Sequence, residues 1–179
     1  SARVQAARLG KLASDLRKLA ELESEPLESA PIDLQELLAE ALAAAQERPE
    51  ASTRDLLLTV PRAPWPRLVV VGDRDLLFMA LYNLLDNALK YTRPGDTVEL
   101  RAFEDGRWAS IEVADSGPGI APDEVEQVWE ELYRSQSARA VPGSGLGLAL
   151  TRAIVRRHGG EVALRSDLGH GTVVSMRLP

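Results

Sequence analysis

The sequence predicts a two-layer α/β (α+β) sandwich in which a mixed sheet of about five strands packs against helices, with part of a further helix before it. Three observations predict this fold. Leucines recur at helical spacing near the start of the chain and again in its middle. Short apolar runs bounded by glycine, proline and acidic residues are typical of strands, and the last two such runs form a hairpin. The 179 residues suit one domain with a short appendage.

The first expected element is a helix over residues 2–23. Four leucines in it alternate at three- and four-residue spacing between charged residues: Leu9, Leu12, Leu16 and Leu19. This spacing is typical of an a/d seam. The helix either packs on its own domain or forms half of a dimeric helical bundle, and the regular seam favours the bundle. Two prolines and the lack of periodicity predict a linker over residues 25–31.

The next helix begins at Asp33, the expected N-cap, because Glu36 stands at the capping-box position and leucines follow on one face. Two strands come next, separated by the proline-rich turn 61–66. A long helix after them is apolar on nearly every side and should therefore be buried. The expected elements of this part are the strands 56–60 and 68–71 and the helix 73–90.

The second half of the chain predicts four more strands and one helix. A loop-rich stretch, residues 115–147, interrupts them and contains one short helical pattern at 123–132. The helix ends at Gly159 and Gly160, which supply a C-cap and a turn. The expected elements are the strands 97–103 and 108–114, the helix 148–158, and a hairpin of the strands 162–166 and 172–178.

Composition excludes several classes of function. The net charge is −6, which argues against general binding of nucleic acids or anionic membranes, since both need a basic surface. The chain has no cysteine, so disulfides, thiol catalysis and cysteine-ligated zinc are excluded. No apolar run approaches the roughly 20 residues of a membrane span. Because the chain starts inside a helical pattern, it is expected to be a piece of a longer protein.

The most informative segment is residues 82–92, where Asn83 and Asn87 stand four positions apart in the apolar helix. Both therefore project from one face. The two amides either cap neighbouring loops or line a polar pocket, and asparagine's poor helix propensity gives weight to the pocket. An amide oxygen is a suitable ligand for Mg²⁺, which also keeps water and phosphate oxygens. Lys90, one turn further on, would place a cation near phosphates.

The second segment is residues 115–120, an Asp-x-Gly-x-Gly pattern at the end of an expected strand. By itself it is a sharp turn. Its functional interpretation is that the Asp115 carboxylate accepts a hydrogen bond from an exocyclic amino group, while glycines let a flat ring approach the backbone.

The third segment is the glycine-rich stretch 142–148, which leads directly into a helix. Glycine at alternate positions, with the helix N-terminus behind them, suits the binding of an anion such as phosphate. The spacing is neither that of a Walker loop nor that of the dinucleotide-binding fingerprint. A flexible linker is the alternative, but a linker would not run straight into an apolar helix.

In this order the three segments resemble the N, G1 and G2 boxes of the catalytic domain of bacterial sensor histidine kinases. That domain has the Bergerat ATP-binding fold, which it shares with gyrase, heat-shock chaperone and mismatch-repair ATPases. Residues 128–134 are similar to the family's F box, and residues 158–160 and 169–172 to its closing elements. The resemblance implies three parts: the end of the second helix of the dimerisation and histidine-phosphotransfer hairpin (1–24), a linker (25–31) and the catalytic ATP-binding domain (32–179).

The resemblance also implies how ATP and Mg²⁺ are bound. Asn87 would bind the metal, Asp115 would receive the adenine amino group, and Arg134 would reach the γ-phosphate from a lid over residues 121–142. Arg134 and Lys90 are the implied catalytic residues. The nucleotide would be held by Asn83, Asn87, Lys90, Tyr91, Asp115, Gly117, Gly119, Ile120, Gly143, Ser144, Gly145, Leu146, Gly147 and Thr172.

The sequence departs from the family pattern in two ways. Trp129 and Leu132 replace the expected phenylalanines of the lid and should still anchor it by apolar contacts. The phosphoacceptor histidine with its acidic neighbour is absent, and the two histidines present, His158 and His170, lie in expected turns as solvent-facing structural residues.

The expected function is therefore that of a protein-histidine kinase fragment. It would transfer the γ-phosphate of ATP to a histidine on a phosphotransfer hairpin outside the chain, for relay to an aspartate of a response regulator. The parent protein is expected to be a homodimer anchored in the bacterial inner membrane, with this part in the cytoplasm and without contact to membrane or nucleic acid. The alternatives are a serine kinase of the anti-sigma type, an ATP-driven clamp, and a scaffold that binds partners without ATP.

Overall fold

The computed structural model describes residues 2–61, 68–135, 141 and 143–179. Most of the expected proline-rich turn, and residues 136–140 and 142 of the expected lid, lie outside the described residues. In the part of the chain that is described, no helix has both the length and the apolar character needed to cross a membrane.

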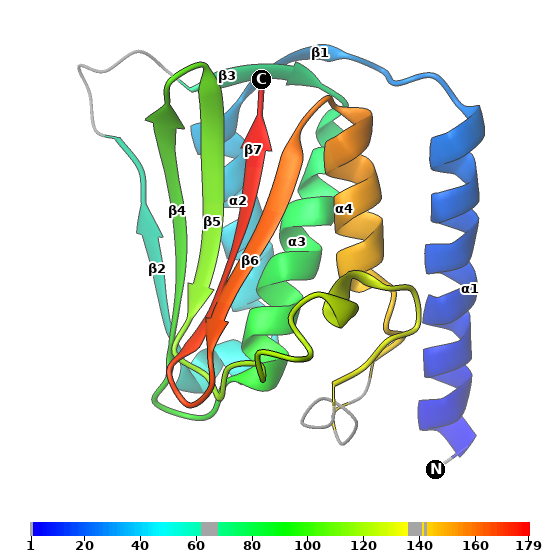
Figure 1. Ribbon diagram of the computed structural model, residues 1–179, viewed down its shortest axis with the longest axis vertical. Coiled ribbons are helices and arrows are strands. Elements are labelled where there is room, and N and C mark those ends of the chain that lie inside the picture. The colour runs from blue at the N-terminus through cyan, green and yellow to red at the C-terminus, as the bar shows by residue number, and fades with distance from the viewer. Residues whose placement is uncertain (1, 62–67, 136–140, 142) are drawn as a thin grey trace.

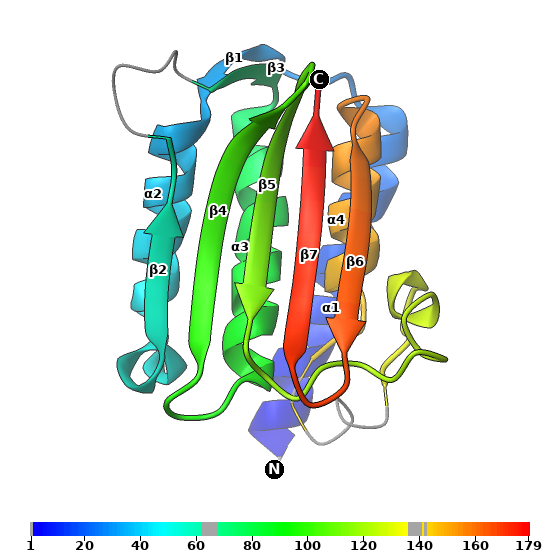
Figure 2. The ribbon, with the colours of Figure 1, turned by 60° about the vertical axis from the view of Figure 1, so that its left-hand side comes forward.

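A five-stranded mixed sheet forms one layer of the fold (Figure 2). One pair of neighbouring strands in this sheet is parallel, and the other three neighbouring pairs are antiparallel. The sheet confirms the predicted fold class, and its last two strands are the predicted hairpin. In spatial order the strands are β2 (Asp55–Thr59), β4 (Thr97–Asp105), β5 (Trp108–Asp115), β7 (Gly171–Leu178) and β6 (Glu161–Asp167).

Three helices cover one face of this sheet (Figures 1 and 2). They are α2 (Leu34–Gln46), α3 (Arg74–Tyr91) and α4 (Gly147–Arg157). The α2 helix begins where predicted, since the Asp33 carboxylate accepts from the backbone N–H of Gln35 at 3.0 Å. The core between the layers is almost entirely aliphatic. Its fully buried side chains include Leu38, Leu81, Leu85, Leu100, Ile111 and Ile154.

A small second sheet closes one end of the fold. It pairs β1 (Ala30–Asp33) antiparallel with β3 (Val69–Gly72), so a strand begins inside the expected linker. The two strands expected on either side of the proline-rich turn accordingly lie in different sheets. Strand β1 has only four residues, which is too short for the sequence to show strand periodicity there.

The N-terminal helix α1 (Ala2–Ser24) stands beside α4 on the side away from the sheet (Figure 1). Its leucine seam is divided between two environments. Leu19 packs against the core and Leu12 is half-buried, whereas Leu9 is 63% and Leu16 43% exposed. Further along, Leu22 is buried. The seam therefore both anchors the helix to its own domain and leaves an apolar stripe on its outer side.

The helical pattern at 123–132 does not form an α-helix. Only one 3-10 turn, η2 (Gln127–Trp129), occurs there. Leu132 adopts the left-handed conformation, with φ of 64°, and its N–H donates to the Gly145 carbonyl at 3.0 Å rather than to a preceding turn. Contact with the glycine-rich segment thus replaces the helical hydrogen bond.

His158 lies at the C-cap of α4 and is buried, which corrects the expectation of a solvent-facing side chain. Its Nε2 accepts from the Asp73 N–H at 2.9 Å, and its Nδ1 lies 2.8 Å from the Ile154 carbonyl. These two bonds require the neutral tautomer with its proton on Nδ1. His158 therefore joins the end of α4 to the start of α3, while His170 is exposed as expected.

Candidate functional site

A cavity of about 430 Å³ lies between α3, the loop after β5 and the start of α4. Every residue that the sequence assigns to the site lines it, except Gly117 and Leu146. Leu146 is fully buried in the protein interior. Gly117 lies behind Asp115 and donates its N–H to the Asp115 carboxylate at 2.9 Å. The structure thus brings together three segments that are far apart in the sequence.

One end of the cavity is polar and is built on α3. Asn83 is buried and Asn87 half-buried, and Gly147 at the first turn of α4 faces both. A Cβ added to Gly147 would stand 3.8 Å from the Asn87 Nδ2. Asn83 Nδ2 is a buried donor for which the described residues provide no hydrogen-bond acceptor. A buried donor without an acceptor, next to a helix N-terminus, suits an anionic ligand.

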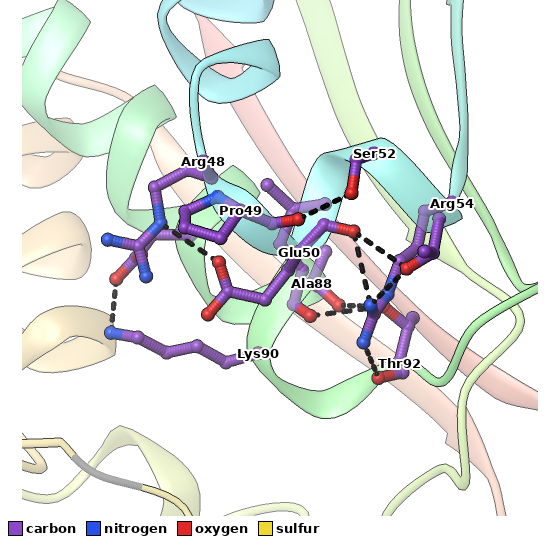
Figure 3. A network of polar contacts seen from close by, with 11 residues as sticks. Arg48, Pro49, Glu50, Ser52, Arg54, Ala88, Lys90 and Thr92 are labelled. Atoms are coloured by element: carbon purple, nitrogen blue, oxygen red, sulfur yellow. Dashed lines mark hydrogen bonds and ion pairs between the residues drawn. The ribbon is translucent and has the colours of Figure 1, made fainter.

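A charged network lies beside this polar end (Figure 3). The Lys90 ammonium contacts one carboxylate oxygen of Asp86, and Arg48 Nη2 stands 3.1 Å from the other. Arg48 Nε is also 3.6 Å from a carboxylate oxygen of Glu50. Sequence reasoning did not assign Asp86 or Arg48 to the site. The four-residue spacing of Asp86 and Lys90 could have indicated their pair, but no sequence signal indicates Arg48.

The opposite end of the cavity is formed by the end of β5 and its partner β7. Asp115 pairs with Thr172 in the sheet. Burial raises the pKa of the Asp115 carboxyl, and the N–H groups of Gly117 and Thr172 oppose that rise. Apolar side chains form the walls beside Asp115: Val113, Ile120, Val128, Leu148, Leu164 and Val174. This end therefore places the Asp115 carboxylate, a hydrogen-bond acceptor, within an apolar slot.

Two glycines let the backbone close around that slot. Gly119 has φ of +70°, and a Cβ there would stand 2.2 Å from the Asp167 carbonyl oxygen. Gly171 has φ of +106°, and its Cβ would stand 1.9 Å from the Asp115 carbonyl oxygen. Neither approach is possible for a residue with a side chain.

The described part of the loop after β5 is anchored by Trp129 and Tyr133. Trp129 is buried below Arg152, which stands 5.9 Å above its ring and donates to its carbonyl at 3.0 Å. The Tyr133 hydroxyl donates to Glu124 at 3.0 Å. Leu132 is 58% exposed, so the expectation that it anchors the loop is wrong. Its left-handed backbone turns the side chain out of the core.

Arg134 and Tyr91 lie together on the cavity wall. The Arg134 guanidinium donates to the Val141 carbonyl. Burial raises the pKa of the Tyr91 hydroxyl, and the nearby positive charge and hydrogen bond of Arg134 oppose that rise. Arg134 therefore lines the cavity.

Helix α1 also reaches the cavity, which the sequence did not predict. Lys11 contributes to the lining. One turn further, the Asp15 carboxylate accepts from the Ser144 hydroxyl of the glycine-rich segment at 2.9 Å. The N-terminal helix therefore contacts the segment that closes the polar end.

Comparison with known proteins identifies the family. Residues 72–179 match the family described as "Histidine kinase-, DNA gyrase B-, and HSP90-like ATPase". The match covers more than half of the chain and includes all three segments of the cavity. The chain belongs to this family, and the Bergerat-type fold expected from the resemblance is confirmed.

Curated relatives are sensor histidine kinases. The chain is 37% identical over 176 residues to the "Signal transduction histidine-protein kinase/phosphatase MprB" of Mycobacterium ulcerans (strain Agy99), which covers 96% of the chain and 33% of that protein. It is 35% identical over 176 residues to the "Signal transduction histidine-protein kinase BaeS" of Escherichia coli (strain K12), covering 96% of the chain and 37% of that protein. The chain thus spans about a third of the length of these relatives.

Solved structures agree with this assignment. A mycobacterial sensor histidine kinase MprB is 35% identical, with a TM-score of 0.75 over 84% of this chain and 97% of that one. Full-length ShkA in complex with AMPPNP is 29% identical, with a TM-score of 0.80 over 96% of this chain and 35% of that one. The chain is homologous to the ATPase catalytic domain of sensor histidine kinases.

Proposed function

We propose that the chain binds ATP together with Mg²⁺ and transfers the γ-phosphate to a histidine on a separate phosphotransfer hairpin. One observation above all supports the proposal. A cavity joins an apolar slot that holds the half-buried carboxylate of Asp115 to a polar end with two amides, a lysine and the N-terminus of α4. An adenine ring with an exocyclic amino group suits the first end, and a triphosphate suits the second.

At the polar end, the chain's own groups supply donors for phosphate oxygens. The buried Asn83 Nδ2 and the backbone of Gly143, Gly145 and Gly147 are the candidates. The Asn87 amide oxygen would hold Mg²⁺, which neutralises charge on the triphosphate. The described residues contain no cluster of three or more His, Cys, Asp or Glu that could hold a metal ion. The metal site would accordingly be one amide completed by phosphate oxygens and water.

At the adenine end, Asp115 would accept the hydrogen bond of the amino group as a carboxylate. Ile120 and the neighbouring aliphatic side chains would cover the faces of the ring. Thr172 supports this end from β7, since its hydroxyl lies 2.8 Å from that of Ser166. Ser166 in turn accepts from the Ile120 N–H at 2.8 Å, which holds the loop against the sheet.

Arg134 and Lys90 are proposed to act in the transfer step. Phosphoryl transfer is accelerated mainly by positioning and by charge stabilisation, and a guanidinium suits the transferred group geometrically. If Arg134 acts mainly in the transition state, Arg134→Ala should lower the transfer rate by about 10²-fold with little change in ATP affinity. Stopped-flow transfer assays and calorimetry measure the two quantities. Equal losses of transfer rate and ATP affinity would mean that Arg134 contacts the nucleotide equally in the ground state and the transition state.

The remaining parts of the proposal concern the parent protein and rest on homology to sensor kinases. Residues 1–24 would be the end of the second helix of the phosphotransfer hairpin, residues 25–31 the linker and 32–179 the catalytic domain. The full-length protein would be a homodimer anchored in the inner membrane, with this region in the cytoplasm, and would relay phosphate to a response regulator.

The proposed site is tested by calorimetry with ATP in the presence and absence of Mg²⁺. Asn87→Ala should weaken binding only when Mg²⁺ is present. Asp115→Ala should weaken ATP binding and reduce the preference for ATP over GTP. Arg107→Ala, an exposed residue beside Trp108, serves as the control. Unchanged affinity in both site variants would refute the assignment.

A further inference from the structure

Asp86 is a buried carboxylate with a different cation on each of its two oxygens. It is 5% exposed, and on α3 it stands one residue before Asn87 and one turn before Lys90. Lys90 contacts Oδ2, while Arg48 Nη2 stands 3.1 Å from Oδ1. A buried carboxylate that loses its only cationic partner strongly destabilises the fold. Because Asp86 has two such partners, it keeps one ion pair when the other is broken.

The two cations differ in their access to the nucleotide. Lys90 and Asp86 line the cavity, but Arg48 is not among the described residues of its lining. Arg48 lies on the segment that follows α2, outside this lining. A phosphate group in the cavity can therefore attract Lys90 and leave Arg48 in place.

Arg48 is held in position by the short helix η1 (Pro49–Thr53), which is attached to the end of α3 (Figure 3). Glu50 stands 3.6 Å from Arg48 Nε. Arg54, just after η1, donates to the Thr92 carbonyl at 2.6 Å and to the Glu50 carbonyl at 3.1 Å. Thr92 is the C-cap of α3. Arg48 thus approaches Asp86 from a segment that is fixed to the same helix.

We propose that Arg48 is a positioning residue that acts through Asp86 to release Lys90 to the phosphates of the nucleotide. When Lys90 turns toward a phosphate, Asp86 keeps its ion pair with Arg48, so the exchange leaves no buried charge without a partner. Without Arg48, Lys90 is the remaining partner of Asp86 among these groups, and phosphate must compete with a buried carboxylate for it. The inference rests on the proposed binding of ATP.

The proposal predicts a loss of affinity that depends on the phosphate chain. Arg48→Met keeps an unbranched, flexible side chain and removes its charge. ATP affinity should fall on the order of tenfold, as for a typical coupling between two neighbouring sites. AMP, which has no β- or γ-phosphate, should bind within about twofold of the unsubstituted protein. Both affinities are measured by competition with a fluorescent ATP analogue at constant Mg²⁺.

Three further variants separate positioning from a structural role. Arg48→Lys retains the charge and should restore most of the ATP affinity. In the double variant Arg48→Met/Asp86→Asn, the neutral amide no longer holds Lys90. The loss of affinity should then be the same for ATP as for AMP. Arg101→Met is the matched control, because Arg101 is 34% exposed, like Arg48 at 32%, and pairs with Glu112 at 3.5 Å on the sheet, outside the cavity lining. Thermal melting verifies that each variant is folded.

The possible outcomes are distinct. Equal losses for ATP and AMP, or no rescue by Asp86→Asn, would mean that Arg48 only supports the fold. Unchanged ATP affinity in a folded Arg48→Met variant would mean that Lys90 can leave Asp86 for a phosphate without the help of Arg48. Either result overturns the inference and leaves the proposed function intact. An unsubstituted protein that binds neither nucleotide would overturn the proposed function and the inference with it.

Discussion

At the scale of single residues, Asp115 is a position where the proposed recognition of adenine and the stability of the fold oppose each other. Burial raises the pKa of its carboxyl, so the folded protein holds the charged form at a cost. The unfolded chain has no such cost. Asp115 therefore destabilises the fold above its raised pKa, and this penalty disappears as the pH falls through that pKa toward the ordinary value of 3.8.

Asp115→Asn should accordingly raise the melting temperature at pH 7, because the amide oxygen can still accept from Gly117 without carrying charge. The gain over the unsubstituted protein should shrink as the pH is lowered toward 4. ATP affinity should be lost in exchange, as is common where a site is built at the expense of stability. Scanning calorimetry across pH measures the gain, with the exposed Asp55→Asn as control. A gain that does not depend on pH would refute the explanation by charge burial.

His158 and Gly72 form the second residue-scale contact with a clear prediction. A Cβ at Gly72 would lie 2.5 Å from His158 Cδ2 and 2.9 Å from its Nε2. Gly72→Ala should displace the ring from the Asp73 N–H and destabilise the protein by about 1–3 kcal/mol. Urea unfolding measures the change. Gly10→Ala, where the added Cβ meets nothing within 4 Å, is the control. A stability of Gly72→Ala equal to that of the unsubstituted protein would show that the imidazole is not constrained.

At the scale of the elements, α1 is the helix with an uncovered apolar side. Leu9 and Leu16 are exposed one above the other, while Leu22 is buried in the domain. An exposed apolar stripe on a regular helix favours association with another helix. The outer half of the seam therefore remains suited to the bundle expected from the sequence.

Leu9→Gln/Leu16→Gln should abolish association that depends on protein concentration while changing the free energy of unfolding by less than about 0.5 kcal/mol. Leu22→Gln, by contrast, should destabilise the domain because its side chain is buried. Sedimentation equilibrium and urea unfolding measure the two effects. Association that persists in the double variant would place the contact on another surface.

At the scale of the whole molecule, the domain has a cavity that we propose binds the phosphoryl donor, but neither of its two histidines is a suitable acceptor. His158 is buried with both ring nitrogens engaged. His170 is exposed at the β6–β7 turn, where its Nδ1 lies 3.2 Å from Asp167, and it is not on a helix. The domain is therefore expected to act on a second polypeptide segment.

Labelled ATP incubated with the chain alone should leave no acid-labile phosphate on it. Addition of a cognate phosphotransfer hairpin with an intact histidine should give label on the hairpin only. The same hairpin with its histidine replaced by glutamine is the control. Label on His158 or His170 would overturn the assignment of the acceptor. A cognate hairpin that stays unlabelled would instead favour the scaffold alternative.

The elements of the fold could be predicted from local patterns because each pattern reflects a local cause. The helix of α3 follows from its run of apolar residues behind the N-cap Asp73, and the β6–β7 hairpin from alternating residues around a turn. The residues of the cavity were predictable for a related reason. Few structural roles explain two asparagines one turn apart in an apolar helix, or a glycine-rich stretch directly before a helix. The order of these segments along the chain resembles that of the sensor histidine kinase catalytic domain.

The remaining features depend on contacts between distant parts of the chain. Arg48 meets Asp86 because η1 is fixed to the end of α3, and His158 is buried because α4 ends against Gly72. Leu132 turns outward because its N–H bonds to Gly145, which lies after it in the chain. The environment of a side chain, and therefore its ion pairs and burial, depends on which elements pack together. Periodicity and spacing within one segment carry no information about that packing.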